Sequence, residues 1–293
     1  MSQLTEKELE DLLAEIGRQI LDQGTGTVGR LGQWGCTTVS VEICPDRVHA
    51  VLNAGACRFG VANTDSASLT DVAGYIDHTL LKAETTLADI DELCHDALRH
   101  GFASVCVNGV HVRRCAEILA GSKVMVCTVV GFPLGAALTE VKSYEARRAI
   151  EDGACEVDMV LNVGAMKSGH HEAVRADVAS VAATCHGLGA RLKVILETCL
   201  LTKDEIVAAS ELCKAAGADF VKTSTGFSSG GATVEDVALM RRAVGPVVGV
   251  KASGGVRDAA AARAMLEAGA TRIGASASVA IARGTPSATG SGY

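Results

Sequence analysis

A short apolar run followed by a longer amphipathic run recurs along the chain from about residue 76 to residue 283. The apolar runs are rich in β-branched residues, as buried strands are, whereas the alanine-rich runs between them have the period of helices. Eight apolar runs are present: IDHTLL (76–81), ASVCVN (103–108), KVMVCTVVG (123–131), EVDMVLN (156–162), RLKVILET (191–198), FVKTST (220–225), VVGVKAS (247–253) and TRIGAS (271–276). Strands that alternate with helices pair in parallel through right-handed crossovers, so eight such units predict a closed (β/α)₈ barrel, the TIM barrel fold.

The ends of the helical runs agree with this arrangement. Glycine follows most of them, as it does where helices stop, and Thr139, Thr202 and Thr233 are predicted N-caps. The clearest helical runs are 86–101, 138–153 and 202–217, with a shorter one at 277–283. An open doubly wound sheet is the alternative, but it predicts a glycine fingerprint after the first strand, and DHTLLKAETT has none.

The first 70 residues stand outside the repeating pattern. Leucine and isoleucine between Leu9 and Leu21 form one face of a predicted helix, and GTGTVGRLGQWG follows it like a flexible tether. We therefore predict an N-terminal helical extension (1–70), an α/β barrel (71–284) and a flexible C-terminal tail (285–293). The extension is expected to be dispensable for chemistry and to serve as an oligomer contact or as a docking or targeting helix.

Composition excludes several classes of protein. The 293 residues carry a net charge of −7 without a basic stripe, which argues against nucleic acid as a partner. No apolar run has the length of a membrane span, and the N-terminus MSQLTEKELEDLL is acidic and amphipathic, unlike a secretory signal. The eleven cysteines form no CxxC pair, so we expect free thiols, a cytoplasmic location and no metal. Cys36, Cys44 and Cys57 leave a metal site open but lack paired spacing.

Two lysines occupy matching positions in the sixth and seventh strand runs. Lys222 in FVKTST and Lys251 in VVGVKAS are each followed two residues later by serine. Strand alternation turns Val221 and Val250 toward the helices and both lysines into the barrel. A lysine among apolar residues and beside a second ammonium has a pKa below its ordinary value of about 10.4, and its neutral amine attacks carbonyls. The pair therefore indicates Schiff-base catalysis, although lysines that merely pair with carboxylates inside the barrel remain an alternative.

A carboxylate and a group of glycines complete the predicted site. Asp158 in EVDMVLN points inward by the same alternation and is either a counter-ion of a lysine or a proton relay. In (β/α)₈ barrels the loops after strands seven and eight often bind phosphate, and backbone N–H groups at glycines can approach an anion closely. The glycines at these strand ends therefore favour a phosphorylated substrate.

At these residues the sequence resembles the deoxyribose-phosphate aldolases. The matching pieces, in order, include IDHTLLK (76–82), VVGFPLG (129–135), EVDMVLNVG (156–164), DFVKTSTGF (219–227), VKASGGVR (250–257) and RIGAS (272–276). The resemblance implies a class I aldolase without a metal or other cofactor. Such an enzyme cleaves 2-deoxy-D-ribose 5-phosphate reversibly to acetaldehyde and glyceraldehyde 3-phosphate, and we further expect a homo-oligomer, either a dimer or a tetramer.

The resemblance also implies residue roles. Lys222 resembles the Schiff-base lysine, Lys251 the second lysine that favours its neutral form and relays protons, and Asp158 the acid/base carboxylate. The positions that resemble substrate-binding residues are Asp77, Thr79 and Cys106. Those that resemble the phosphate-binding residues are Gly226, Gly254, Gly255, Gly274 and Ser276. Many relatives have a second serine where this chain has Ala277, so one phosphate hydroxyl is expected to be missing.

The last residue, Tyr293, ends a polar glycine-rich tail, as in some relatives. Such a tail can just reach back over the barrel rim, so its phenol is either a proton relay or without a role. Three other functions stay open: a different Schiff-base sugar-phosphate aldolase, a barrel without activity that serves as a binding module, and a zinc-dependent aldolase. The last needs histidines at strand ends, whereas His170, His171 and His186 fall in or near helical runs.

Overall fold

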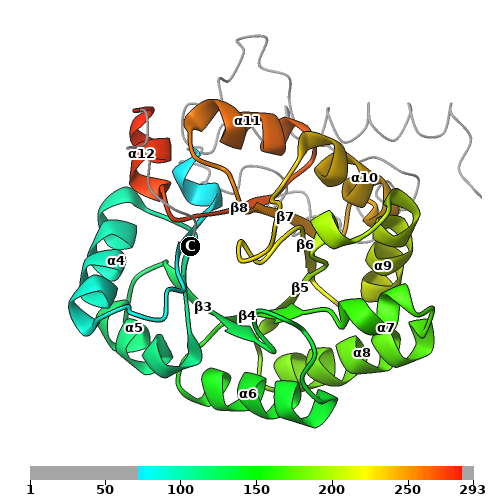
Figure 1. The fold of residues 1–293 in the computed structure, drawn as a ribbon. Coiled ribbons are helices and arrows are strands. Elements are labelled where there is room, and N and C mark those ends of the chain that lie inside the picture. Colours follow the sequence, from blue (N-terminus) through cyan, green and yellow to red (C-terminus); the bar gives the residue numbers. More distant parts are fainter. Residues whose placement is uncertain (1–71, 286–293) are drawn as a thin grey trace, which may run out of the picture. The chain divides into compact units, whose positions relative to one another are not determined.

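The computed structural model describes residues 72–285 and closes their eight strands into one barrel with helices around it (Figure 1). Each strand pairs in parallel with its neighbour in chain order, and β8 returns to pair with β1. The strands are β1 (Ile76–Leu80), β2 (Ser104–Val107), β3 (Met125–Val130), β4 (Glu156–Val160), β5 (Arg191–Ile195), β6 (Phe220–Lys222), β7 (Gly249–Ser253) and β8 (Arg272–Ala275). The predicted TIM barrel is confirmed. The predictions for residues 1–70 and for the tail with Tyr293 lie outside the described residues.

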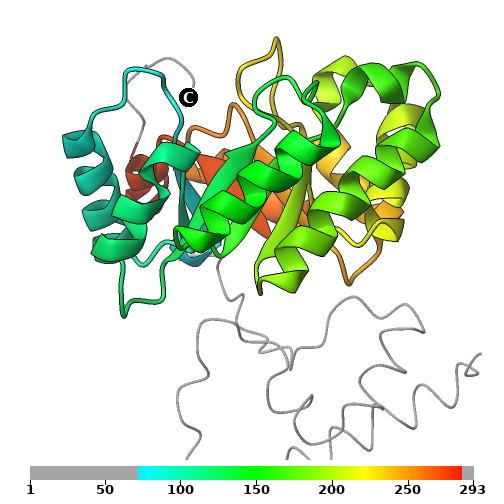
Figure 2. The ribbon, with the colours of Figure 1, turned by 90° about the horizontal axis from the view of Figure 1, so that it is seen from below.

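Helices lie against the outside of the barrel and slant along its wall (Figure 2). They are α4 (Leu87–His100), α5 (Val112–Ile118), α6 (Thr139–Glu151), α7 (Val163–Lys167), α8 (His171–Gly187), α9 (Lys203–Ala215), α10 (Val234–Val244), α11 (Ala259–Glu267) and α12 (Ser278–Arg283). Three 3₁₀ turns lie before β1, α5 and α9, respectively: η1 (Ala73–Tyr75), η2 (Gly109–His111) and η3 (Thr198–Leu200). Two helices, α7 and α8, occupy the single connection between β4 and β5. Within residues 72–285, no helix is both long enough and apolar enough to cross a membrane.

The predicted caps are confirmed at two helices and wrong at a third. Thr202 and Thr233 accept backbone N–H groups at the starts of α9 and α10. The N-cap of α6 is Leu138, and Thr139 is already inside the helix. The Thr139 hydroxyl donates to Asp177 of α8 at 2.8 Å. A tertiary hydrogen bond therefore uses the hydroxyl that the local pattern assigned to capping.

The sixth strand is shorter than predicted, because it ends at Lys222 and not at Thr225. The Thr225 N–H donates to the Glu197 side chain, and the Thr223 hydroxyl bonds to the backbone of Ser253. The backbone of Thr223 still bonds to Lys251 and Thr198, but at Thr225 the Glu197 side chain takes the place of a strand partner. Lys222 consequently lies at the carboxyl end of its strand, the end at which (β/α)₈ barrels carry their active sites.

Alternation along the strands separates an apolar layer from a polar interior. Val157, Met159, Val221 and Val250 face outward and belong to the hydrophobic core between strands and helices. Their neighbours Asp158, Lys222 and Lys251 are buried but stand outside that core. The barrel is thus held together by its outer layer, while its interior holds charged side chains at the site that we describe next.

Candidate active site

Lys222 and Lys251 meet at one oxygen atom of Asp158. The two lysines are direct partners in the register of β6 and β7. The Nζ atom of Lys222 donates to Asp158 Oδ2 at 2.9 Å, and that of Lys251 donates to the same oxygen at 2.8 Å. Asp158 is fully buried and Lys222 nearly so. The structure therefore brings together the three residues that the sequence singled out.

A third lysine, which the sequence analysis did not single out, completes the surroundings of Asp158. Lys193 of β5 donates to Asp158 Oδ1 at 2.8 Å and lies 2.7 Å from a carboxylate oxygen of Glu156. The signal was present in RLKVILET, where a lysine interrupts an apolar strand run just as Lys222 and Lys251 do. Glu156 gave the same signal, since it precedes Asp158 by two residues and shares its face.

Asp77 and Arg272 extend the cluster across the barrel. Asp77 lies 2.6 Å from Lys251 Nζ, and Arg272 donates to Asp77 at 2.6 Å and to Glu156 at 3.0 Å. We call the connected set the interior charge network. Its buried members are Asp77, Glu156, Asp158, Lys193, Lys222, Lys251 and Arg272, and the half-exposed Arg191 pairs with Glu156 at its edge. Breaking one buried pair leaves the other charge uncompensated, so each of these residues depends on its partners.

The network fixes the charge of two groups beside Lys222. Burial alone would raise the pKa of Asp158, but Lys193, Lys222 and Lys251 overcome burial and hold it well below its ordinary value. Burial would likewise lower the pKa of Lys251, but Asp158 and Asp77 hold it well above its ordinary value. Asp158 is therefore an anion and Lys251 a cation throughout the neutral range.

The buried part of the network has one more basic group than it has carboxylates. Four basic residues face three acidic ones. Lys222 has the most exposed side chain of the three lysines, at 3% against 0% for Lys193 and Lys251. Lys222 is thus the lysine of the network nearest to solvent, at the carboxyl end of its strand.

The ring of Phe220, the first residue of β6, packs against the basic side chains of the network. The ring lies 5.5 Å from the Arg272 guanidinium carbon and 5.9 Å from Lys193 Nζ. A Cβ atom at Gly249 would lie 2.1 Å from this ring, so only glycine fits at the strand position opposite Phe220. The absence of a side chain at Gly249 therefore leaves room for the Phe220 ring.

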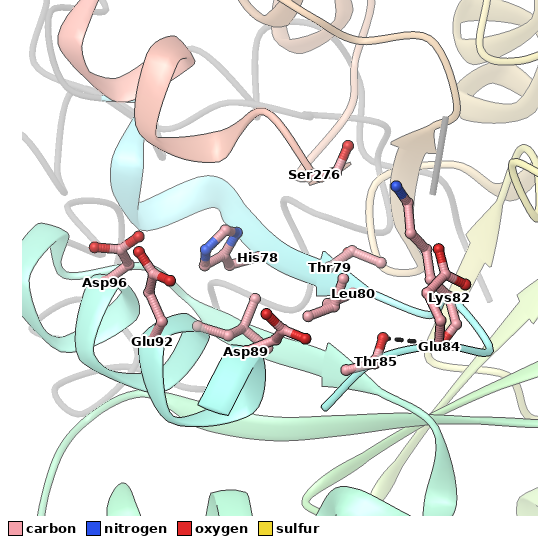
Figure 3. Close-up of a pocket in the computed structure, with 11 residues that line it drawn as sticks. His78, Thr79, Leu80, Lys82, Glu84, Thr85, Asp89, Glu92, Asp96 and Ser276 are labelled. Atoms are coloured by element: carbon pink, nitrogen blue, oxygen red, sulfur yellow. Dashed lines mark hydrogen bonds between the residues drawn. The ribbon is translucent and has the colours of Figure 1, made fainter. Parts of the chain in front are cut away.

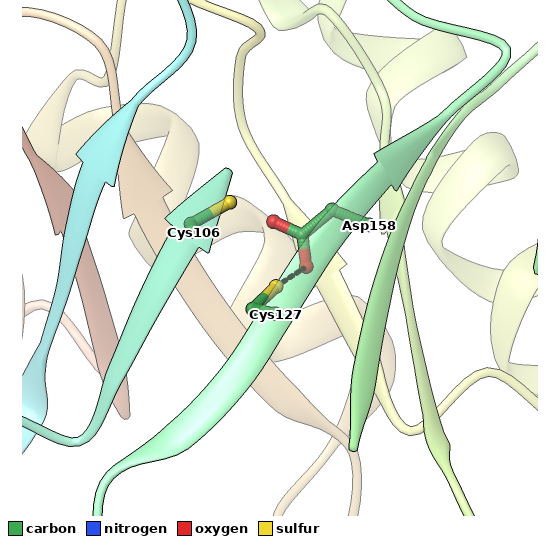
Figure 4. A group of neighbouring side chains, drawn as sticks. All are labelled: Cys106, Cys127 and Asp158. Atoms are coloured by element: carbon green, nitrogen blue, oxygen red, sulfur yellow. Dashed lines mark hydrogen bonds between the residues drawn. The ribbon is translucent and has the colours of Figure 1, made fainter. Parts of the chain in front are cut away.

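Two thiols lie against Asp158. Figure 4 shows Cys106 of β2 and Cys127 of β3 beside the Asp158 carboxylate, and Cys127 Sγ lies 3.1 Å from Oδ1. The donor atoms of these three buried residues lie within 4.8 Å of one another, which is close enough to hold a metal ion. However, both oxygens of Asp158 already accept hydrogen bonds from ammonium groups. A dication at this point would meet their repulsion, so the donor set fits a metal poorly.

The predicted substrate residues of β1 take different positions. Asp77 is a fully buried member of the interior charge network. The Thr79 hydroxyl donates back to the Asp77 carbonyl at 2.8 Å, and Thr79 lines a pocket of 410 Å³ together with Ser276 (Figure 3). This pocket lies between α4, the end of β1 and the segment after β8, and its lining includes the carboxylates of Glu84, Asp89, Glu92 and Asp96.

The predicted phosphate glycines surround the ends of β6, β7 and β8. Gly226, Gly254 and Gly255 have φ values of 87°, 82° and 78°, in the left-handed region that favours glycine. A Cβ atom on Gly231 would lie 2.3 Å from the Gly254 carbonyl oxygen, so the loops after β6 and β7 pack backbone against backbone. Gly274 lies within β8, opposite Ser253.

Serine at position 278 does not replace the hydroxyl expected at Ala277. Ser278 is fully buried, and its hydroxyl donates to the Ala275 carbonyl at 2.8 Å. Ser276 is exposed at the carboxyl end of β8. Of these two serines, only Ser276 is available to a ligand.

The histidines considered for a zinc site lie outside the interior charge network. His170 precedes α8, His171 begins it, and His186 is near its end, where it bonds to Asp219 at 2.9 Å. They do not converge with the carboxylates of the barrel.

Comparison with known proteins gives consistent matches. Residues 71–287 match the family model described as DeoC/LacD family aldolase. A deoxyribose-phosphate aldolase of Brevibacillus brevis is 63% identical over 219 residues, which are 75% of this chain and 98% of the relative. One of Thermococcus gammatolerans is 56% identical over 220 residues, 74% of this chain and 98% of the relative. The solved tetrameric deoxyribose phosphate aldolase of Aeropyrum pernix has a TM-score of 0.69 and 35% identity, covering 74% of this chain and 91% of that one.

Proposed function

The chain belongs to the DeoC/LacD family of aldolases, and on that premise we propose that it cleaves 2-deoxy-D-ribose 5-phosphate through a Schiff base on Lys222. The products are acetaldehyde and D-glyceraldehyde 3-phosphate, and the reaction is reversible. The observation that carries the proposal is the sharing of one Asp158 oxygen by Lys222 and Lys251. That geometry supplies a nucleophile, a fixed cation and a proton acceptor within hydrogen-bond reach of one another.

Imine formation is the first step of the proposed mechanism. The neutral amine of Lys222 attacks the C1 aldehyde of the open-chain sugar and forms a carbinolamine. Loss of water then requires a proton on the departing oxygen, and Asp158 and Lys251 are positioned to exchange it. The resulting iminium carbon withdraws electrons from the neighbouring bond.

Carbon–carbon cleavage follows from the iminium ion. A base accepts the proton of the C3 hydroxyl, the C2–C3 bond breaks, and its electrons form an enamine on C1 and C2. D-Glyceraldehyde 3-phosphate leaves, C2 takes up a proton, and hydrolysis returns acetaldehyde and the Lys222 amine. We assign the base role to Asp158, because its lowered pKa keeps it ionised, and the stabilising cation to Lys251.

The remaining predicted residues are proposed to bind the substrate. Backbone N–H groups at Gly226, Gly254 and Gly255, after β6 and β7, and at Gly274 in β8 are proposed to hold the phosphate, with Ser276 adding a hydroxyl. Thr79 and Ser276, at the ends of β1 and β8, are proposed to bind the sugar phosphate, whereas the four carboxylates of the pocket in Figure 3 would repel its phosphate group. Asp77 and Cys106, which are fully buried, are proposed to shape the site from within.

The overall proposal is tested by incubating the purified protein with 2-deoxy-D-ribose 5-phosphate and measuring both products. We expect acetaldehyde and D-glyceraldehyde 3-phosphate in equal amounts, with unchanged activity after EDTA treatment. A protein that forms neither product, or one whose activity disappears with EDTA, would contradict the proposal.

Replacing Lys251 with leucine is expected to move the rising limb of the pH–rate profile to higher pH by about one unit. Lys251 stays protonated in the wild type, so its ammonium opposes a second proton on Lys222 at all working pH values. Without that repulsion the neutral amine forms only at higher pH. The profile of kcat/KM against pH measures the shift, and circular dichroism checks the fold. A profile that does not move would mean that the two lysines are not coupled.

Tyr293 lies outside the described residues, and we propose its phenol as a proton relay at C2 of the enamine. Replacing Tyr293 with phenylalanine removes the hydroxyl and keeps the ring. Exchange of deuterium between labelled acetaldehyde and water should slow by about 10²-fold or more. Borohydride trapping at Lys222 should stay normal. Equal exchange rates in the two proteins would leave the tail without this role.

The assembly and location of the enzyme are further parts of the proposal. We propose a homo-oligomer, either a dimer or a tetramer, and the tetrameric relative supports self-association. Size measurement in solution would decide between these states. The eight cysteines within residues 72–285 are free thiols, which supports our proposal of a cytoplasmic enzyme.

A further inference from the structure

Glu197 is a buried acidic residue at the end of β5 that the mechanism above does not use. It is 4% exposed, and no lysine or arginine of residues 72–285 pairs with it. Its φ and ψ of 57° and 61° lie in the left-handed region that residues other than glycine rarely adopt. Glu197 therefore has an unfavourable backbone conformation, and residues with such strain are often found at functional sites.

Backbone hydrogen bonds on both sides of Glu197 hold it there. The Leu196 N–H donates to the Lys222 carbonyl, and the Thr198 N–H donates to the Thr223 carbonyl, each at 2.9 Å. The two residues that flank Glu197 are thus tied to the chain just where β6 ends. The Glu197 side chain is directed at the segment that follows Lys222.

The Glu197 carboxylate fixes the residues on both sides of Gly226. The Thr225 N–H donates to Oε1 at 3.2 Å, and the Thr225 hydroxyl donates to Oε2. The oxygen of the same hydroxyl accepts the Phe227 N–H at 3.1 Å. One carboxylate therefore holds Thr225 directly and Phe227 through the Thr225 hydroxyl.

Gly226 lies between these two fixed residues with its own N–H unused. Its φ is 87°, it is partly exposed, and its N–H donates to no group among residues 72–285. A free backbone N–H in a turn of this kind is a donor for anions. Because both neighbours are fixed, the direction of this N–H is fixed as well.

We propose that Glu197 is a positioning residue for the phosphate of the substrate, acting through Thr225 to aim the Gly226 N–H at a phosphate oxygen. The inference rests on the proposed function, since it deepens the phosphate site of the same reaction. Glu197 does not touch the substrate. Donors from Thr225 hydrogen-bond to both of its oxygens, so the side chain faces the loop.

The test compares two substrates that differ only in the phosphate group. Glycine at position 197 fits the left-handed backbone without strain and removes the carboxylate, and valine at position 225 keeps the shape of threonine without the hydroxyl. For Glu197→Gly and Thr225→Val, KM for 2-deoxy-D-ribose 5-phosphate should rise about tenfold or more. The kinetic constants for 2-deoxy-D-ribose should stay within about twofold, and the double variant should be no worse than the poorer single one.

Two further variants separate positioning from general support of the fold. Glu197→Gln keeps an oxygen for the Thr225 N–H and should recover part of the lost affinity. Glu205→Gln is the matched control, because the Glu205 carboxylate also accepts a backbone N–H, from Thr202 at 2.8 Å, at the start of α9. It should lower stability without changing the preference between the two substrates.

Binding of inorganic phosphate, measured by calorimetry, gives a readout that needs no turnover. It should weaken in Glu197→Gly and Thr225→Val by about the same factor as KM rises. A folded Glu197→Gly protein with wild-type phosphate binding would overturn the inference, as would an equal loss with both substrates. A wild-type protein whose phosphate binding depends on Glu197, but which does not cleave the sugar phosphate, would overturn the proposed function and not this inference.

Discussion

Turnover falls at least about 10⁴-fold when Lys222 is replaced by arginine, if the proposed imine chemistry is correct. Arginine keeps a long side chain with hydrogen-bond donors for Asp158, so the change tests the nucleophilicity of the side chain. A guanidinium stays protonated at all working pH values and cannot attack a carbonyl. The rate of cleavage of 2-deoxy-D-ribose 5-phosphate measures the effect, with thermal unfolding as the check on folding.

The matched control for this variant is arginine at position 251. Lys251 is proposed to act as a cation, and arginine remains one, so Lys251→Arg should still form an imine with acetaldehyde at Lys222. Lys222→Arg should form none. If the two variants behaved in the opposite way, the roles of the two lysines would have to be exchanged.

Replacing Asp158 with asparagine is expected to lower both turnover and stability. Three lysines share this carboxylate. Its loss leaves Lys193 with Glu156 and Lys251 with Asp77 as anionic partners, but leaves Lys222 with none in a buried place. We expect a loss of about 3–5 kcal/mol in the free energy of unfolding. The rate should fall about 10³-fold, as when a positioned acid or base is removed. Urea unfolding and steady-state kinetics measure the two effects.

The pH dependence of this stability has a defined sign. The folded-state pKa of Asp158 is below its unfolded value of about 3.9, so its contribution is fully present above that value. The contribution is lost only as the pH falls through the lower folded-state pKa. The stability difference between wild type and Asp158→Asn should therefore be constant near neutral pH and shrink in acid.

Asp177→Asn is a control with a similar burial cost. Asp177 pairs with the fully buried Lys142 at 2.6 Å, between α6 and α8 and outside the interior charge network. This variant should lose stability by a comparable amount but keep its rate when folded. A large loss of rate in both variants would mean that activity simply follows stability.

The barrel and the central residues were predictable because both depend on local periodicity. Eight apolar runs separated by helical runs specify the strand order, and alternation within FVKTST and VVGVKAS specifies which lysines face inward. Register then brings Lys222 and Lys251 side by side, as adjacent parallel strands require. None of these steps needs information from distant parts of the chain.

The rest of the site depends on contacts that a linear pattern does not contain. Asp158 and Lys193 are neighbours in register, but which carboxylate balances which lysine depends on how the strands close around the interior. The sequence analysis extended β6 to Thr225 because threonine favours strands. In the structure the Thr225 N–H donates to the Glu197 side chain and not to a neighbouring strand. Thr139 was misassigned for the same kind of reason, since its hydroxyl bonds to Asp177 across two helices.

The most direct test of the proposed mechanism is mass spectrometry of the protein after borohydride reduction in the presence of acetaldehyde. Reduction converts an imine into a stable secondary amine, so the modified lysine keeps a two-carbon group through proteolysis. The account predicts this group on the peptide that contains Lys222, and its absence from the peptides with Lys193 and Lys251. A label on either of those lysines, or no label while the enzyme turns over, would contradict it.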